Sequence, residues 1–161
     1  MNEMNIDISI AHQTLTLIDS AGTTKAVYCI STATNGVGCE KNSGCTPLGT
    51  HIIRAKIGMG APLNAVFVGR RLTGEICTPE LMAQFPNRDW ILTRILWLSG
   101  TEIGKNRLSN VDSMQRYIYI HGTPDSEPMG EPHSHGCIRM RSADVIALFE
   151  QVKVGTRVLI N

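Results

Sequence analysis

The chain has no long hydrophobic run, no excess of charge of either sign and few aromatic residues. Its 161 residues include eight aromatic residues, and fifteen Lys and Arg residues face fourteen Asp and Glu residues. A nucleic-acid-binding surface usually needs a basic stripe and aromatic residues for base stacking. A membrane span needs roughly 20 apolar residues in a row. We therefore expect neither a nucleic-acid partner nor insertion into a membrane.

The N-terminus lacks the features of a secretory signal, because no Lys or Arg precedes Lys25 and no long apolar run is present. The cysteines are odd in number and form no C-x-x-C pair, which indicates free thiols in a reducing compartment rather than a disulfide framework. They are Cys29, Cys39, Cys45, Cys77 and Cys137. We predict a cytoplasmic protein, or a periplasmic one if a leader has been removed.

The length fits one domain over residues 1–161, with enough chain for a hydrophobic core. Apolar and polar residues alternate in short runs separated by turn residues, a pattern typical of β-hairpins. Strands are expected at 6–10, 15–17, 26–30, 51–57, 65–68, 91–98, 117–120 and 157–160. The sequence therefore predicts a mostly antiparallel β domain.

Two short helices are expected on the flank of this sheet. Residues 78–84 begin with Thr-Pro, which suits an N-cap Thr78 followed by a proline in the first turn. After Ser142, a second candidate N-cap, the apolar residues recur at helical spacing and predict one buried face. These residues are Val145, Leu148, Phe149 and Val152. Residues 70–90 are irregular and could form a lid.

The segment of residues 121–140, HGTPDSEPMGEPHSHGCIRM, holds three histidines and one cysteine among three prolines and three glycines. Cys137 becomes a strong nucleophile only if a neighbour takes its proton. His135, two residues earlier, shares its face in extended backbone. His121 lies at the end of a predicted strand that could fold back onto the thiol. The spacing leaves both histidines open as the base.

Two neighbours of Cys137 fit acyl-transfer chemistry. Gly136 permits a tight turn and leaves consecutive backbone N–H groups free to form an oxyanion hole. Arg139 offers a planar fork to a substrate carboxylate.

Metal binding is the main alternative use of this segment, through His121, His133, His135 and Cys137. The candidate carboxylates that would bond to these metal ligands and orient them are Asp125, Glu127 and Glu131. The other thiols and histidines carry weaker signals. Cys29 and Cys77 are expected in the core, and His12 on a solvated strand. Cys39 and Cys45 do not have the spacing of a common zinc site with His51.

The run Ser134-His-Gly-Cys-Ile-Arg-Met140, preceded by Ile120-His-Gly-Thr123, resembles the signature of the YkuD-type L,D-transpeptidase domain. The segments Thr46-Pro-Leu-Gly-Thr50 and Gly155–Ile160 resemble its further conserved regions, so the resemblance covers essentially the whole chain. The resemblance implies an antiparallel sandwich or barrel-like fold without a cofactor or a resident metal.

The resemblance also implies roles for individual residues. Cys137 matches the nucleophile and His121 the general base, whose second ring nitrogen is oriented by the carbonyl of Gly122. The pocket-shaping positions are Ser134, His135 and Gly136. Arg139 would contact substrate or brace the loop, and His133 has no transferred role.

The implied substrate is a peptidoglycan stem peptide, free or in a soluble muropeptide. Cys137 would attack the carbonyl of the third residue, a diaminopimelate, and expel the terminal D-Ala to leave a thioester. Because no leader is seen, we expect water to end the reaction as in an L,D-carboxypeptidase of cell-wall recycling. An L,D-transpeptidase that uses an amine acceptor is the alternative. Carbapenems should acylate Cys137. The sequence makes no prediction of the oligomeric state.

Overall fold

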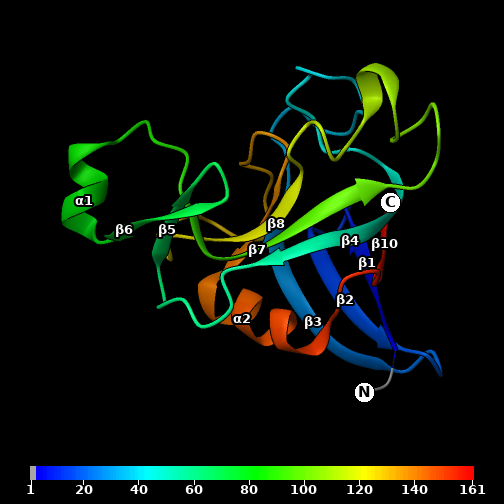
Figure 1. Cartoon of the computed structure of the whole chain (residues 1–161), viewed down its shortest axis with the longest axis horizontal. Coiled ribbons are helices and arrows are strands. Elements are labelled where there is room, and N and C mark those ends of the chain that lie inside the picture. Colours follow the sequence, from blue (N-terminus) through cyan, green and yellow to red (C-terminus); the bar gives the residue numbers. More distant parts are fainter. Residues whose placement is uncertain (1–2) are drawn as a thin grey trace.

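The structure is a computed structural model that describes residues 3–161. These residues form ten strands, two α-helices and a short 3₁₀ turn at Ser109–Val111 (Figure 1). The strands are β1 (Met4–Ser9), β2 (Thr14–Asp19), β3 (Thr24–Ser31), β4 (Gly49–Ile57), β5 (Ala65–Val68), β6 (Arg71–Ile76), β7 (Ile91–Gly100), β8 (Tyr119–Thr123), β9 (Ile138–Arg141) and β10 (Arg157–Ile160). The helices are α1 (Pro79–Gln84) and α2 (Ser142–Gln151). The predicted mostly β fold with two short helices is confirmed.

The sheet closes on itself, because β4 pairs with both β10 and β7. The order around the ring is β4-β10-β1-β2-β3-β9-β8-β7, and β5 and β6 continue outward from β7. Most pairings are antiparallel, but β1 runs parallel to β10 and β8 runs parallel to β9. Closure removes the free edges of eight strands from solvent. The β8–β9 pair carries the two halves of the sequence motif side by side.

The main core fills the ring and extends beneath it to α2. Alternate residues of β1 and β2 point inward, including the fully buried Ile8 and Leu17. The apolar face of α2, with Val145 and Leu148 buried, packs against the strands that carry the motif (Figure 1). This packing fixes β8 and β9 against the core. No helix within residues 3–161 has the length and apolar character needed to cross a membrane.

Residues 65–90 form an arm that projects from the ring at β7 (Figure 1). The arm contains β5, β6 and α1, so the expected irregular segment has regular structure. A small cluster of Val66, Cys77, Trp90 and Leu92 holds it together. Thr78 caps α1 as predicted, with its hydroxyl accepting the Leu81 N–H at 3.1 Å.

Four local expectations need correction, and one is confirmed. Cys29 is exposed, because its side chain falls on the outer face of β3. Ser142 is the first residue of α2 rather than its cap, and its hydroxyl accepts a hydrogen bond from Thr93 Oγ1 at 2.7 Å. The strand predicted at 117–120 covers 119–123, which places His121 inside it. His12 lies in an exposed turn, and Cys77 is buried as predicted.

Candidate active site

The chain turns sharply just before Cys137, and three hydrogen bonds hold the turn. Ser134 Oγ accepts the Gly136 N–H at 3.2 Å and donates to the Cys137 carbonyl at 2.6 Å. Thr46 Oγ1, in the loop of residues 32–49, donates to the Gly136 carbonyl at 2.9 Å. Gly136 has φ +137°, a conformation that side chains seldom adopt. The turn thereby fixes the position of the Cys137 thiol at the start of β9.

The Gly136 amide differs from the sequence prediction. Its N–H is bonded to Ser134 Oγ, so it is not a free oxyanion-hole donor in this conformation. The predicted pair of consecutive free N–H groups is therefore incomplete. Ser134 shapes the turn by using its hydroxyl both as acceptor and as donor.

The Cys137 thiol lies against the backbone of the segment that leads into β8. Sγ accepts the Tyr119 N–H and donates to the Tyr117 carbonyl, each at 3.4 Å. The pKa of Cys137 is raised to about 12, mainly by burial. The Tyr119 N–H and the charges of Arg139 and Arg116 oppose this rise, and the Asp89 charge contributes to it. The thiol is therefore protonated at neutral pH, and the reaction needs a base.

His121 is buried in β8, and its ring is held in one orientation. Nδ1 is 2.6 Å from the Gly122 carbonyl, and an N–H there must be the donor because a carbonyl only accepts. Burial lowers the pKa of His121, although the Gly122 bond opposes this shift. The ring is therefore neutral at pH 7, and Nε2 keeps a free lone pair. The residue can act as a general base.

The strand register brings His121 and Cys137 to one side of the sheet. His121 pairs with Arg139 in the parallel β8–β9 ladder, and Tyr119 and Cys137 each lie two residues earlier in their own segments. Residues two apart along a strand share a face. All four side chains line one cavity of about 540 Å³. The candidate nucleophile and base therefore come from adjacent strands that open into the same space.

A second cavity, of about 410 Å³, also reaches Cys137. The two cavities share Arg116, Tyr117, His135 and Cys137 in their walls. Arg116 donates to the Cys45 carbonyl at 2.7 Å and so ties the loop of residues 32–49 to this wall. Cys137 thus borders both cavities.

His135, the second candidate base, is placed differently from His121. Its side chain is 77% exposed, and Nδ1 is 3.9 Å from Asp89 Oδ2, which is longer than a hydrogen bond. Within the part of the chain that the structure describes, no backbone carbonyl is hydrogen-bonded to its ring. His135 lines both cavities, so a pocket-forming role suits it better than that of a preoriented base.

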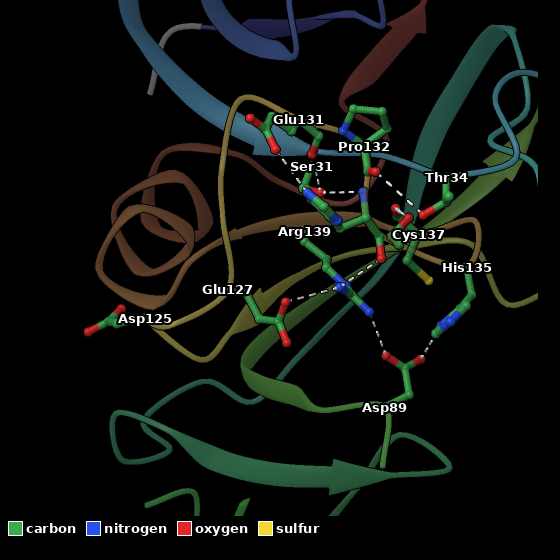
Figure 2. A network of polar contacts seen from close by, with 12 residues as sticks. Ser31, Thr34, Asp89, Asp125, Glu127, Glu131, Pro132, His135, Cys137 and Arg139 are labelled. Carbon is green, nitrogen blue, oxygen red and sulfur yellow. Dashed lines mark hydrogen bonds and ion pairs between the residues drawn. The ribbon is translucent and has the colours of Figure 1, made fainter. Parts of the chain in front are cut away.

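Arg139 uses its guanidinium inside the protein (Figure 2). Nη1 donates to the His133 carbonyl at 3.1 Å, and Nη2 donates to Asp89 Oδ1 at 3.1 Å. Glu127 Oε2 is 3.8 Å from Nη1. Only Nε, which is buried, lacks a partner among residues 3–161. Of the two roles expected for Arg139, the one visible here is that it braces the loop.

The four residues of the metal alternative do not converge. The partly exposed His133 ring contacts Glu131, with Nε2 and Oε2 3.1 Å apart, while its backbone N–H donates to Ser31 Oγ. Among residues 3–161, no three His, Cys, Asp or Glu side chains are grouped closely enough to hold a metal ion. His51 is buried between the Gly49 carbonyl and the Ser113 hydroxyl, away from such a role.

Asp89, Arg116, Tyr119 and Arg70 also line the site and were not predicted. Arg70, at the tip of the β5–β6 hairpin, donates to the Tyr119 hydroxyl at 3.0 Å and lies over the Trp97 ring at 4.7 Å. Such residues carry no local signal in the sequence, because the fold alone brings them to Cys137. The proposed lid segment contributes Asp89 to the wall of the larger cavity.

Comparison with known proteins gives a consistent family. The model of the YkuD family, described as L,D-transpeptidase catalytic domain, matches residues 3–160. Putative L,D-transpeptidase YkuD of Bacillus subtilis is 34% identical over 107 residues, 65% of this chain and 63% of that protein. Putative L,D-transpeptidase YqjB of the same organism is 54% identical over 46 residues, 29% of this chain and 26% of that protein.

A solved structure shares the fold. L,D-transpeptidase 3 from Mycobacterium tuberculosis, in complex with a faropenem-derived adduct, superposes with a TM-score of 0.61 at 16% identity, over 99% of this chain and 60% of that chain. The present chain thus spans about three fifths of that structure, and its matches cover smaller or similar shares of the curated relatives. Since the family model spans nearly all of it, the chain belongs to the YkuD family of L,D-transpeptidase catalytic domains.

Proposed function

We propose that the chain is a cysteine acyltransferase that acts on peptidoglycan stem peptides, with Cys137 as nucleophile and His121 as general base. The observation that carries this proposal is the neutral His121 ring, fixed by the 2.6 Å bond to the Gly122 carbonyl. It lies in the strand beside Cys137 and lines the same cavity. The Gly122 carbonyl takes the place that a carboxylate has in a protease triad.

The proposed reaction has two steps. His121 Nε2 takes the proton of the Cys137 thiol, and Sγ attacks the carbonyl carbon of the third stem residue. The C–N bond to the terminal D-Ala breaks, the protonated His121 returns the proton to the leaving amine, and a thioester remains. A second nucleophile then attacks the thioester, loses its proton to His121 and frees the thiol.

The second cavity at Cys137 favours an amine of another stem peptide as that nucleophile. A donor in one cavity and an acceptor in the other would meet at the sulfur, and L,D-transpeptidase activity is therefore the first candidate. Water reaches the same thioester, so L,D-carboxypeptidase activity is the second. A role in recycling of soluble muropeptides in the cytoplasm stays a prediction.

Mass spectrometry after incubation with a disaccharide-tetrapeptide, alone and with an amine acceptor, tests the proposal. We expect loss of D-Ala, a transient adduct on Cys137, and a cross-linked or amine-exchanged product when acceptor is added. A tripeptide product that is unaffected by acceptor would favour the carboxypeptidase. Cys137→Ala should abolish all products and keep the fold, and turnover by this variant would contradict the assignment.

A β-lactam probe tests the thiol independently of the natural substrate. A faropenem-derived adduct occurs in the related Mycobacterium tuberculosis structure. We expect faropenem and carbapenems to add their mass to the intact protein at Cys137. Loss of activity with EDTA, together with insensitivity to iodoacetamide, would instead support the metal alternative.

A further inference from the structure

Asp89 is the single acidic side chain among the residues that line the larger cavity. It lies in the loop between α1 and β7, and its carboxylate faces Arg139 on one side and His135 on the other (Figure 2). Oδ1 accepts a hydrogen bond from Arg139 Nη2 at 3.1 Å. Oδ2 is 3.9 Å from His135 Nδ1, too far for a hydrogen bond. Oδ2 is therefore free to accept from a ligand, and the carboxylate is about half exposed.

The rest of the charged lining of this cavity is positive. Arg70, Arg116 and Arg139 come from three separate segments and meet around the cavity. Such a wall attracts carboxylates and repels a cationic ligand. If an otherwise anionic ligand also carries an ammonium group, the carboxylate of Asp89 is the one negatively charged side chain in the cavity wall that can pair with it. The cavity thus fits a ligand with several carboxylates and one ammonium.

We propose that Asp89 is a specificity-determining residue that binds a free ammonium group of a stem peptide beside Cys137. The inference rests on the proposed function, in which the third stem residue, diaminopimelate, carries an ammonium group on its side chain. Oδ2 accepts from this ammonium while Oδ1 stays on Arg139. The ammonium can belong to the acyl donor or to the acceptor peptide, since both reach Cys137.

Binding at Asp89 also couples recognition to chemistry. The Asp89 charge raises the pKa of the Cys137 thiol and so opposes formation of the thiolate. An ammonium bound to Asp89 offsets that charge, and the thiol then ionises more easily. A peptide with a free ammonium should therefore acylate the enzyme faster, in addition to binding more tightly.

The test compares two tetrapeptides, one with a free side-chain ammonium and one with that group acetylated. Without acceptor, the release of D-Ala gives kcat/KM for acylation by each peptide. We expect the unchanged enzyme to prefer the free ammonium by about tenfold, as for a charge-assisted hydrogen bond to a half-exposed carboxylate. Asp89→Asn should reduce the preference to near one, and Asp89→Glu should restore part of it.

Glu127→Gln is the matched control, because Glu127 also approaches the Arg139 guanidinium, at 3.8 Å, but does not line the cavity. It should leave the preference unchanged. If the ammonium belongs to the acceptor, Asp89→Asn will instead raise the acceptor concentration needed for half-maximal transfer, and Asp89→Glu will lower it again. Either result supports the proposal.

Two results would overturn the role of Asp89. In the first, Asp89→Asn lowers kcat/KM equally for both peptides with transfer unchanged, which would leave Asp89 only as a support of Arg139. In the second, Asp89→Asn accelerates the free-ammonium peptide more than the acetylated peptide, so that the preference rises; Asp89 would then occupy the place of a substrate carboxylate. In both cases thioester forms on Cys137. Absence of any thioester from either peptide would overturn the proposed function itself.

Discussion

Three charged side chains act on the Cys137 sulfur in opposite directions. Asp89, in the loop before β7, raises the pKa of the thiol, while Arg139 in β9 and Arg116 in the turn before β8 lower it. Burial is the largest cause of the raised pKa. The proposed nucleophile is therefore a thiol in the absence of substrate, and its charge environment can be changed one residue at a time.

Asp89→Asn should accelerate alkylation of Cys137 by iodoacetamide at neutral pH by severalfold. Removing the negative charge lowers the pKa of the thiol, so a larger fraction is thiolate at a given pH, and a tenfold change corresponds to one pKa unit. The measurement is the pseudo-first-order rate between pH 6 and 9, followed by mass. Arg139→Gln should shift the profile the other way. A slower rate in Asp89→Asn would contradict this account of the charges.

His121→Ala should slow D-Ala release by roughly 10²-fold or more, the usual scale for loss of a general base. The loss should fall on kcat more than on KM, because the proposed role of the buried His121 is to move a proton rather than to bind the peptide. His135→Ala is the comparison, since its exposed ring has no fixed orientation. A mild effect of His121→Ala beside a severe effect of His135→Ala would assign the base to His135.

Sequence alone indicates candidate catalytic residues where a short local motif contains them, and their catalytic roles stay a prediction. Cys137 and His121 stand in short runs that hold a nucleophile, a base and glycines. Asp89 and Arg116 could not be found this way, because each is an ordinary charged residue until the fold brings it to the cavity. The expected contact of Arg139 with a substrate carboxylate stays a prediction. Its other expected role, bracing the loop, is seen in the bonds to the His133 carbonyl and Asp89, but the sequence did not indicate these partners.

At the scale of elements, the His121-Gly122 pair determines how closely β8 packs against its neighbours, in addition to supplying the candidate base. No residue with a side chain fits at position 122 without a shift of the backbone. A Cβ on Gly122 would lie 2.6 Å from the Leu92 carbonyl oxygen and 2.9 Å from Ser142 Oγ. The glycine lets β8 approach β7 and α2 closely, and this close packing keeps the neighbouring His121 buried. The close fit of three elements therefore requires the His-Gly pair seen in the sequence.

Thr46→Val should destabilise the turn before Cys137. The Thr46 hydroxyl accepts the Ala33 N–H at 3.0 Å and donates to the Gly136 carbonyl at 2.9 Å, and valine leaves both buried groups unpaired. We expect a loss of about 1–3 kcal/mol in the free energy of unfolding, together with slower acylation of Cys137. Urea denaturation and faropenem acylation measure the two effects.

Thr34→Val is the matched control for this clamp. Its hydroxyl lies in the same loop but donates to the Pro132 carbonyl at the longer distance of 3.4 Å, in an exposed position. It should change stability and acylation little. If both variants lose stability and acylation rate equally, the loop of residues 32–49 affects the site through its overall structure. The bond from Thr46 to the Gly136 carbonyl would then have no separate role.

At the scale of the whole molecule, local alternation predicted most strands but not how they close. The parallel pairing of β1 with β10 joins residues from the two ends of the described chain, with Ile6 opposite Val158. No local pattern specifies such a contact, since it is decided by burial of apolar faces that are distant in sequence. The same holds for β8 and β9, whose parallel register sets the geometry of the site.

Acid should destabilise the whole fold through buried histidines. His51 is fully buried, and burial lowers its pKa from 6.5 to about 4. As the pH falls below about 6.5, His51 binds a proton in the unfolded chain but not in the folded chain. The free energy of unfolding is therefore nearly constant well above that pH and decreases as the pH drops toward 4. Between pH 6.5 and 5 the loss is about 2 kcal/mol from His51. His121, also buried with a lowered pKa, adds to it with the same sign.

Urea denaturation from pH 7.5 to 5 measures this dependence, and His51→Gln isolates it. Glutamine cannot bind the proton, so the variant should be less stable at pH 7.5, where it loses the bonds to Gly49 and Ser113, but should show a smaller fall toward pH 5. His12→Gln, in an exposed turn, should keep the fall of the unchanged protein. An equal fall in His51→Gln would mean that the pH dependence arises elsewhere. In that case His121→Gln, alone and combined with His51→Gln, would show whether His121 causes the loss of stability toward pH 5.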